Sequence, residues 1–442
     1  MKKIGKYLLI FWISFFILAL AMGATRHVYT SGNKIQGKAK DVIEFLASFI
    51  TNVKNYDDLK NGMLTDNIPS LKNGFNYTSN YKKSNDYLLE SSWDKDKNQN
   101  VVRLLEINSG KTIHIWRPSI EVINKLSNKK KKYGVRNYID TKSTRLLHPY
   151  LFSDGSVLFG GNGIYLMNKN AKIIWQSTLT SHHSIEKDFE NNFWICGFNT
   201  NKKNTVTYQI TDDAIQKINP KNGKLLFEKS IFEILIENGF QRSEIFINPI
   251  ITTDKKELDY FHLNDIQPVL SDSKFWKKGD LFISLRHQNR IFLYRPSTNK
   301  IIWTTNGSWL KQHDIDIIDN HQISFFGNNV LDADFSNRNK NFIDGNNTEY
   351  FFDFNTKTIS KPYDNLFTKN KIKTATQGLS EIVNNDHIFI EETDKGRLLY
   401  GDKYKIQWIY INRVDKNHLS DFNWCRYITE DEFKKFTFVS KK

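Results

Sequence analysis

The chain of 442 residues is poor in cysteine, proline and glycine, and each shortage excludes a class of protein. With only two cysteines, Cys196 and Cys425, it is not a scaffold held together by many disulfides. The sequence leaves open whether these two pair, although Cys196 lies in the apolar segment FWICG and is typical of a buried thiol. Eight prolines and 22 glycines exclude collagen-like and linker-type sequence. We therefore expect a globular chain.

Acidic residues are outnumbered, 48 against 63 lysines and arginines, which gives a net charge of +15. A positive charge of this size fits an anionic substrate, an anionic membrane surface or nucleic acid. The lysines are spread along the chain except at Lys129–Lys132, and no recognition helix or aromatic RNA motif accompanies them. We therefore expect no nucleic-acid partner.

Long hydrophobic runs are absent except for one at the N-terminus, Tyr7–Ala24, whose 18 residues carry no charge. Three lysines precede it and Arg26 follows, so we predict a transmembrane helix, residues 1–25, with a cytoplasmic N-terminus. A cleaved signal peptide is the competing interpretation, because Ala19 and Ala21 offer small residues at a plausible cleavage spacing. In both cases the rest of the chain is exported, and we expect a periplasmic body tethered to the cell membrane.

Residues 26–86 form a second region, which has no repeats. Apolar residues recur there at helical spacing and predict one amphipathic helix; they are Val42, Phe45, Leu46, Phe49, Ile50 and Val53. A polar connector follows this helix. The composition changes at Tyr87, and we place the main domain at residues 87–442.

A short pattern recurs through the main domain: a turn rich in Asn, Lys and Gly, then a lysine, two aliphatic residues and an aromatic residue. The clearest copies are AKIIW, GKLLF, NKIIW and YKIQW, and two looser copies are KTIHIW and TKTIS. Their lysines, about 50 to 75 residues apart, are Lys111, Lys172, Lys224, Lys300, Lys357 and Lys405. Such a period, with several short strands in each unit, is typical of propeller blades. The predicted fold is all-β, a six-bladed β-propeller.

Other segments fit the same unit. Apolar runs such as SVLFG and IYLMN precede the closing segment and predict the inner strands of a blade. The two wide gaps contain SIEVINKL, residues 119–126, and IFEILIENGF, residues 231–240, which predict short helical insertions. Because a blade buries both faces, we expect the repeated aromatic residue in the core between blades.

Polar side chains stand at the ends of apolar runs, mostly between residues 259 and 329. In FHLND, His262 and Asn264 fall on one face of an extended segment, so an imidazole and an amide are presented together. Arg286 closes the strand LFISL, where a structural arginine normally has a carboxylate partner. Strand ends of successive blades share a rim, so these side chains can converge on a ligand.

A histidine pair, His182 and His183, opens the third repeat. Adjacent residues of a strand face opposite sides, so we expect only one of them, preferably His183, at a shared site. The pair has no carboxylate or third histidine at metal-ligand spacing, and we expect neither a metal nor a cofactor.

Several segments together resemble the exported aryl-sulfate sulfotransferases. They are HHSIEKD with NNFWICG, FHLND, GDLFISLR, KIIW, QHD with ISFFGNN, and GLSEI with IEETDKGRLLY, and the resemblance covers residues 87–430. It implies a six-bladed propeller that moves a sulfuryl group between phenols without a nucleotide sulfate donor. The family's best-known members also have an N-terminal β-sandwich domain and a disulfide, which this chain does not match. Dimerisation through that domain is therefore not carried over.

The resemblance also implies site residues, which are His262, Asn264, Arg286 and His313, with a further histidine from His182 or His183. A sulfate monoester is an anion, so a neutral imidazole suits the role of nucleophile, and a sulfohistidine intermediate divides the transfer into two displacements. We place the nucleophile on His313, where a neighbour, Gln312 or Asp314, can fix its tautomer. His262 then handles the proton, and Arg286 with Asn264 holds the sulfuryl oxygens.

Two other functions stay open at this point. A membrane-tethered propeller can bind a polyanionic glycan or protein without chemistry, because fold does not imply function. A sulfate-ester hydrolase would differ from the transferase only in using water as acceptor. The partners expected for the transferase are a small sulfate ester, a hydroxyl acceptor and, through the N-terminal helix, the membrane.

Overall fold

The computed structural model describes residues 11–15, 64–119, 121–123, 144–161, 163–177, 179–200, 211–246, 250–251, 258–331, 342–384 and 386–439. The chain divides into two compact units, Met1–Met63 and Leu64–Lys442. In the first unit residues 11–15 are helical, and the rest of the predicted membrane segment and the predicted amphipathic helix lie outside the described residues. No helix within the described ranges is long and apolar enough to cross a membrane.

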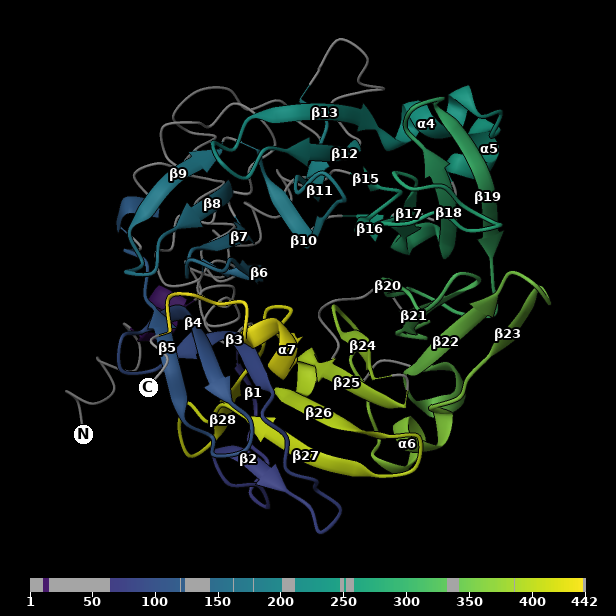
Figure 1. Ribbon diagram of the computed structural model, residues 1–442. Helices are drawn as coiled ribbons and strands as arrows, with labels where there is room; N and C mark the ends of the chain where they lie inside the picture. The colour runs from purple at the N-terminus through teal and green to yellow at the C-terminus, as the bar shows by residue number, and fades with distance from the viewer. Residues whose placement is uncertain are drawn as a thin grey trace. The chain divides into compact units, whose positions relative to one another are not determined.

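The second unit is a six-bladed β-propeller, and its blades stand around a ring (Figure 1). Four blades consist of four antiparallel strands in chain order, from the innermost to the outermost. Blade 2 has β6 (Leu147–Leu151), β7 (Val157–Gly161), β8 (Gly163–Met167) and β9 (Ile173–Ser177). Blade 3 has β10 (Ser181–Lys187), β11 (Phe193–Phe198), β12 (Asp213–Ile218) and β13 (Leu225–Ser230). Blade 4 has β16 (Leu263–Pro268), β17 (Leu281–Leu285), β18 (Arg290–Arg295) and β19 (Lys300–Asn306). Blade 5 has β20 (His313–Ile317), β21 (Gln322–Gly327), β22 (Thr348–Asp353) and β23 (Thr358–Ser360).

The two remaining blades close the ring by joining the two ends of the unit. Blade 1 contains β3 (Tyr87–Asp94), β4 (Gln99–Glu106) and β5 (Thr112–Trp116), and its innermost strand is β29 (Arg426–Ile428) from the C-terminal end. Blade 6 contains β24 (Leu379–Val383), β25 (His387–Glu392), β26 (Arg397–Asp402) and β27 (Ile406–Ile411), and β2 (Gly74–Tyr77) adds a fifth strand outside. A small sheet of β1 (Leu64–Asp66) and β28 (His418–Ser420) pairs the same two ends once more.

The six copies of the repeated pattern form the outermost of the four blade strands, β5, β9, β13, β19, β23 and β27, as predicted. The turns before these strands explain the abundance of asparagine and aspartate there. The side chain of Asn168 accepts a hydrogen bond from the backbone N–H of Lys172, and the side chain of Asp402 accepts one from the backbone N–H of Lys405. An Asx turn of this kind ends one strand and starts the next without a glycine.

The hydrophobic core is divided among the gaps between neighbouring blades. One cluster, for example, packs Cys196 and Ile215 of blade 3 against Ile266 and Phe292 of blade 4. Each blade therefore buries both faces, as the continuous apolar runs predict. Among the repeated aromatic residues Trp116 and Trp408 are fully buried, whereas Trp175 and Trp303 are only partly buried. Both cysteines are free and buried, so they do not form the disulfide that the sequence left open.

Helices are few among the described residues. The predicted insertion in blade 3 forms α4 (Ile231–Glu237), which is capped by Ser230 and followed by α5 (Arg242–Ile245). In the other predicted insertion residues 121–123 are helical. The remaining elements are short: α6 (Asp364–Lys369), α7 (Glu430–Phe433), η2 (Arg286–Gln288), η3 (Ile343–Gly345), η4 (Thr393–Lys395), and the strand pair β14 (Ile250–Ile251) and β15 (Leu258–Asp259).

Candidate active site

Each of the six innermost strands has a residue with a positive φ within two positions of its start, either just before the strand or inside it. The values lie between 44° and 84°, and the residues are His148, His183, His262, Asp314, Gln377 and Trp424. Residues other than glycine adopt this conformation rarely, because the Cβ atom crowds the backbone. Four of these strands also change register near their start. A bulge re-aims the side chains beside it, so the repeated irregularity gathers polar groups at one end of the central channel.

Imidazole rings from three blades meet there. The ring of His183 has its centre 5.0 Å from that of His262 and 5.7 Å from that of His313. The indole of Trp424, which precedes β29, lies 5.8 Å from His183 and 6.2 Å from His313. The structure therefore brings together three histidines that the sequence singled out and adds a tryptophan that it did not.

His313 is buried at the start of β20, and Asn328 fixes its tautomer. His313 Nδ1 lies 2.6 Å from Asn328 Oδ1. The amide group of Asn328 donates to the carbonyl oxygens of Thr374 and Gln377, at 3.0 and 2.8 Å, so its oxygen faces the imidazole. Nδ1 must therefore carry the proton, and Nε2 keeps the lone pair. Burial and then the charge of Arg286 hold the pKa of His313 well below its usual value, which keeps the ring neutral.

The neighbours expected to orient His313 have other partners. The side-chain amide of Gln312 donates to Ser284 Oγ at 3.0 Å and so points into blade 4. Asp314 accepts the backbone N–H of Ser380 in blade 6 at 2.9 Å. The expectation that one of them fixes the tautomer is wrong, because both side chains are bonded to groups of other blades.

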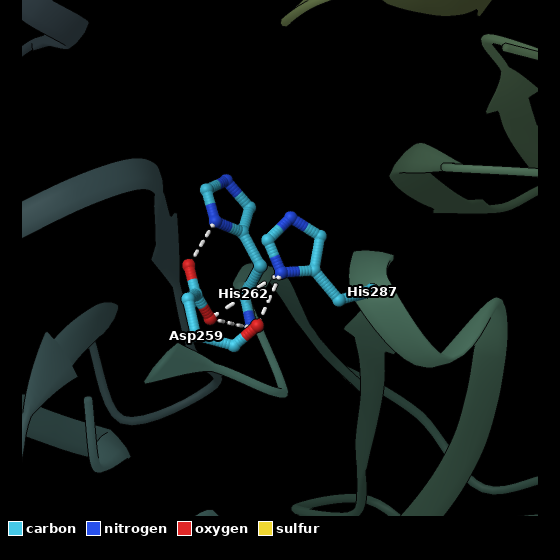
Figure 2. Close-up of side chains that lie close together, drawn as sticks. All are labelled: Asp259, His262 and His287. Carbon is cyan, nitrogen blue, oxygen red and sulfur yellow. Dashed lines mark hydrogen bonds and ion pairs between the residues drawn. The ribbon is translucent and has the colours of Figure 1, made fainter. Parts of the chain in front are cut away.

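His262 is held by Asp259 (Figure 2). Its Nδ1 lies 2.7 Å from Asp259 Oδ2, and its backbone N–H donates to Asp259 Oδ1 at 2.9 Å. The ring of His287 stacks on His262 with centres 4.4 Å apart, and its Nδ1 donates to the backbone carbonyl of Asp259 at 2.9 Å. The Nε2 atoms of both rings point away from Asp259 towards the same side (Figure 2).

The contacts of Asp259 and His262 set their charges. Burial by itself would raise the pKa of Asp259, but His262 and then His287 lower it well below its usual value. Burial lowers the pKa of His262 to about 3, although Asp259 acts in the opposite direction. At neutral pH the pair is therefore a carboxylate and a neutral imidazole with its lone pair on Nε2.

Asp259, His262 and His287 also lie close enough together to be considered as metal ligands. The two imidazole nitrogens nearest the carboxylate are both hydrogen-bond donors, to the Asp259 carboxylate and to its carbonyl. A protonated nitrogen cannot bind a metal, so binding through these two Nδ1 atoms would require both hydrogen bonds to break. The arrangement fits a hydrogen-bonded unit better than a metal centre.

The histidine pair differs from the prediction. His182 and His183 do not face opposite sides, because their Nδ1 atoms lie 3.0 Å apart. The cause is local: His183 has a φ of 84°, and β10 changes register between Ser181 and Ile185, so strand alternation does not hold. His182 Nε2 lies 3.4 Å from Asp213 Oδ1, close enough for an ion-pair contact. Burial raises the pKa of Asp213 to about 6, against the effect of His182.

Arg286 is buried beside the imidazoles, with 4% of its surface exposed. Its Nη2 donates to the carbonyl oxygen of Ala375 at 3.2 Å, and its Nη1 is buried without a hydrogen-bond partner among the described residues. No described carboxylate lies within ion-pair distance of Arg286, although Asp259 and Asp394 act on it from farther away. Burial lowers the pKa of Arg286 to about 10, so the guanidinium remains charged at neutral pH. A buried cation with a free N–H is suited to binding an anion.

Asn264 is fully buried in β16. Its amide nitrogen donates to the carbonyl oxygen of Gln312 at 2.6 Å, which leaves one N–H, and its Oδ1 finds no partner in the described part of the chain. His262 lies just before this strand with a φ of 50°, so the two residues are close in sequence without sharing a regular extended segment.

Four residues of this site were not predicted from the sequence: Asp259, His287, Asn328 and Trp424. Asp259 and His287 stand next to predicted residues, at position −3 from His262 and +1 from Arg286. A carboxylate three residues before a histidine is a usable signal for an orienting pair. Asn328 and Trp424 come from distant strand ends and give no local signal.

Comparisons with known proteins give low similarity to solved structures and a match to a family model. Among solved structures, similar chains include virginiamycin B lyase from Staphylococcus aureus in a catalytically inactive form with quinupristin, at 12% identity and a TM-score of 0.38, covering 76% of this chain and 88% of that one. The Dos1 propeller is similar at 8% identity and a TM-score of 0.35, covering 80% and 76%. These values are too low to bear on fold or function. No curated protein matches.

A family model gives the decisive comparison. The arylsulfotransferase (ASST) model matches residues 149–413, which is more than half of the chain. The matched range contains His183, His262, Arg286 and His313, and it runs from blade 2 into the end of blade 6. Most of blades 2 to 6 and the three imidazoles that meet at the site lie in the matched range, and the chain belongs to the arylsulfotransferase family.

Proposed function

We propose that this site transfers a sulfuryl group from an aryl sulfate to a phenolic or other hydroxyl acceptor, through a sulfohistidine at His313. The observation that carries the proposal is the buried guanidinium of Arg286, which has no ion-pair partner among the described carboxylates and lies beside imidazoles held neutral. A buried, unpaired charge is costly, and an anionic ligand removes that cost. Membership of the arylsulfotransferase family makes a sulfate ester the expected anion.

In the first half-reaction the Nε2 lone pair of His313 attacks the sulfur atom. An N–S bond forms, the bond between sulfur and the aryl oxygen breaks, and the phenolate leaves with that electron pair. The proton on Nδ1 stays in its hydrogen bond to Asn328. The intermediate is therefore a sulfo-imidazolium, in which the imidazole is a good leaving group for the next step.

Arg286 and Asn264 are placed to hold the oxygens of the group in transfer. Charge moves among these oxygens as the S–O bond lengthens, and fixed donors stabilise the transition state more than the ground state. Arg286 offers Nη1, and Asn264 offers the N–H that is not bonded to Gln312. His183, with His182 against it, lies between His262 and His313 and supplies a further imidazole beside the sulfuryl group.

In the second half-reaction an acceptor hydroxyl attacks the sulfur atom of the intermediate. His262 Nε2 takes the hydroxyl proton, the new O–S bond forms, and the electron pair of the N–S bond returns to His313 Nε2. The resulting imidazolium at His262 then loses its proton to solvent. All bonds, protons and electron pairs balance without a metal or a nucleotide.

The proposal includes the location expected from sequence. The uncharged run Tyr7–Ala24 and its positive flank support a body on the periplasmic side of the cell membrane, anchored or released by cleavage. Protease accessibility in intact and permeabilised cells, together with the N-terminal residue of the purified protein, tests this part.

Incubation of the purified protein with an aryl sulfate, with and without a phenol acceptor, tests the reaction. A transferase produces a sulfated acceptor and releases the donor phenol faster when acceptor is present. Equal release without acceptor would indicate a hydrolase, and no release would leave only a binding role.

Arg286→Gln should lower kcat/KM by about 10² to 10³-fold. The matched control is Arg295→Gln, because Arg295 pairs with Asp280 outside the site.

A further inference from the structure

Asp259 has no role in the proposed reaction so far, although its carboxylate contacts the imidazole that handles the proton. Its carboxylate accepts hydrogen bonds from Nδ1 and from the backbone N–H of His262, at 2.7 and 2.9 Å. Its backbone carbonyl oxygen accepts a hydrogen bond from Nδ1 of His287 at 2.9 Å. One residue therefore orients two stacked rings, whose Nε2 atoms point to the same side (Figure 2).

We infer that Asp259 is a positioning residue for the acceptor half of the reaction, forming with His262 the base that deprotonates the acceptor hydroxyl; this rests on the proposed function. The carboxylate holds the proton on Nδ1, so that the lone pair is on Nε2. It then stabilises the imidazolium that forms when Nε2 takes the acceptor proton.

The three-residue spacing is what permits this contact. Asp259 is the last residue of the short strand β15, and the backbone of His262 adopts a left-handed conformation with a φ of 50°. The carboxylate of Asp259 can therefore reach both the backbone N–H and the ring of His262. His287 stacks on the ring of His262 and is 96% buried. Its own Nδ1 is hydrogen-bonded to the backbone carbonyl of Asp259. The ring of His262 is therefore fixed in position as well as in tautomer.

The inference assigns Asp259 to one half-reaction only. A donor with an acidic phenol leaves as phenolate and needs no proton, so sulfuryl transfer to His313 proceeds without the base. An ordinary alcohol or phenol acceptor must lose its proton as it attacks, and an acceptor that is already ionised need not. Loss of the base therefore slows discharge to ordinary acceptors and spares both the first half-reaction and ionised acceptors.

The test variant is Asp259→Asn, which keeps the oxygen that receives the backbone N–H but presents an N–H2 group or a neutral oxygen to Nδ1. With 4-nitrophenyl sulfate as donor, the burst of nitrophenol should keep its wild-type rate within about threefold, by the usual scatter of such comparisons. Steady-state turnover with phenol as acceptor should fall by about 10² to 10⁴-fold. With pentafluorophenol, which is ionised at neutral pH, most of the turnover should return.

The control is Asp280→Asn, because Asp280 is an equally buried carboxylate of blade 4 that pairs with Arg295 at 2.7 Å. It should leave both phases unchanged. Equal losses of burst and turnover in Asp259→Asn, or equal losses with phenol and pentafluorophenol, would overturn the inference. If the wild type shows neither burst nor turnover, the proposed function fails instead.

A second measurement does not depend on activity or on the stability of the variant. The hydrogen bond between His262 Nδ1 and the carboxylate should give a low-field proton resonance in the wild-type protein at neutral pH. The signal should disappear in His262→Gln and persist in Asp280→Asn. A wild-type spectrum without a low-field signal that depends on His262 would show that Asp259 does not hold this ring.

Discussion

Asn328 decides which nitrogen of His313 can react. Its amide nitrogen is held by two carbonyl oxygens of the segment that precedes β24, so its side chain cannot rotate without leaving those carbonyls unpaired. Its side-chain oxygen then accepts a hydrogen bond from Nδ1 of His313. Backbone carbonyls of the neighbouring blade thus orient the side chain of Asn328, and Asn328 favours the tautomer of His313 that carries its proton on Nδ1.

We predict that Asn328→Leu lowers the rate of the phenol burst by about tenfold or more, which corresponds to ~1.4 kcal/mol in the barrier. The leucine removes the nearer of two acceptors at Nδ1 and leaves only the carbonyl oxygen of Lys311 at 3.1 Å, so a share of the rings will carry the proton on Nε2. Stopped-flow release of nitrophenol measures the effect. Asn329→Leu is the control, because Asn329 bonds Tyr350 and Leu310 and touches no imidazole. An unchanged burst rate in Asn328→Leu would contradict this role.

The pH dependence of the burst follows from the environment of His313. An exposed histidine becomes protonated near pH 6.5 and then loses its nucleophilic lone pair. Because burial and Arg286 hold the pKa of His313 well below that value, the ring stays neutral as the pH falls through 6.5. We predict a burst rate that is level from pH 8 to pH 5.5. A loss of rate with a midpoint near 6.5 would contradict the assignment of His313.

Among the elements, the outer strands were predictable from sequence and the starts of the inner strands were not. The pattern of KIIW and its copies recurs along the sequence and marks one strand in each blade. Ile174 and Ile302 of this strand are nevertheless 54% and 41% exposed, because the outer face of the blade is open to solvent. The positive φ of His183 and Asp314 depends on how a strand meets its neighbour, so local sequence rules placed the histidine pair and the partner of His313 wrongly.

The strand β29 is short but joins the two ends of the propeller, pairing Arg426 with Leu89 and Ile428 with Tyr87. Ile428 is 6% exposed and packs in the core between blades 1 and 2. We predict that Ile428→Ala lowers the free energy of unfolding by about 2 to 5 kcal/mol. Ile174→Ala, on an exposed edge strand, should cost less than about 0.5 kcal/mol. Chemical denaturation of both variants measures the difference, and equal losses would argue against closure of the ring by β29.

At the scale of the whole molecule, six blades were predicted from six copies of one pattern, but the closure of the ring was not. The segment RYI of β29 is too short to be distinguished in the sequence, and its partner β3 lies more than 300 residues away. The same distance explains why Trp424 was missed at the site. The resemblance of short segments to a known family identified His262, Arg286 and His313, whereas Asp259 and Asn328 needed the structure.

Several innermost strands carry buried carboxyl groups, and these groups make stability depend on pH. Burial, and then Glu186, raises the pKa of Asp265 to about 8, and burial raises the pKa of Glu381 to about 7. Burial and Glu381 raise the pKa of Asp316 well above its usual value. Between pH 6 and 8 these groups hold protons in the folded state that the unfolded chain has already released.

We therefore predict that the free energy of unfolding falls as the pH rises from 6 to 8. The slope is about 1.4 kcal/mol per pH unit for each carboxyl that remains protonated in the folded state. Histidines whose pKa is lowered by burial oppose this trend between pH 6 and 7, because the unfolded chain still binds protons there and the folded state does not. The fall is therefore steepest between pH 7 and 8. Urea denaturation at several pH values measures it. Asp265→Asn should flatten the slope, and a stability that rises towards pH 8 would contradict the prediction.

The central claim is that His313 carries the sulfuryl group between donor and acceptor. Rapid quenching after mixing with an aryl sulfate, followed by digestion at alkaline pH and mass spectrometry of the peptides, tests it directly. We predict one sulfuryl group on the peptide that contains His313, its loss when a phenol is added before quenching, and no label in His313→Ala. A label on His262 or His183, a label that an acceptor does not discharge, or turnover by an enzyme that never becomes labelled would contradict the claim.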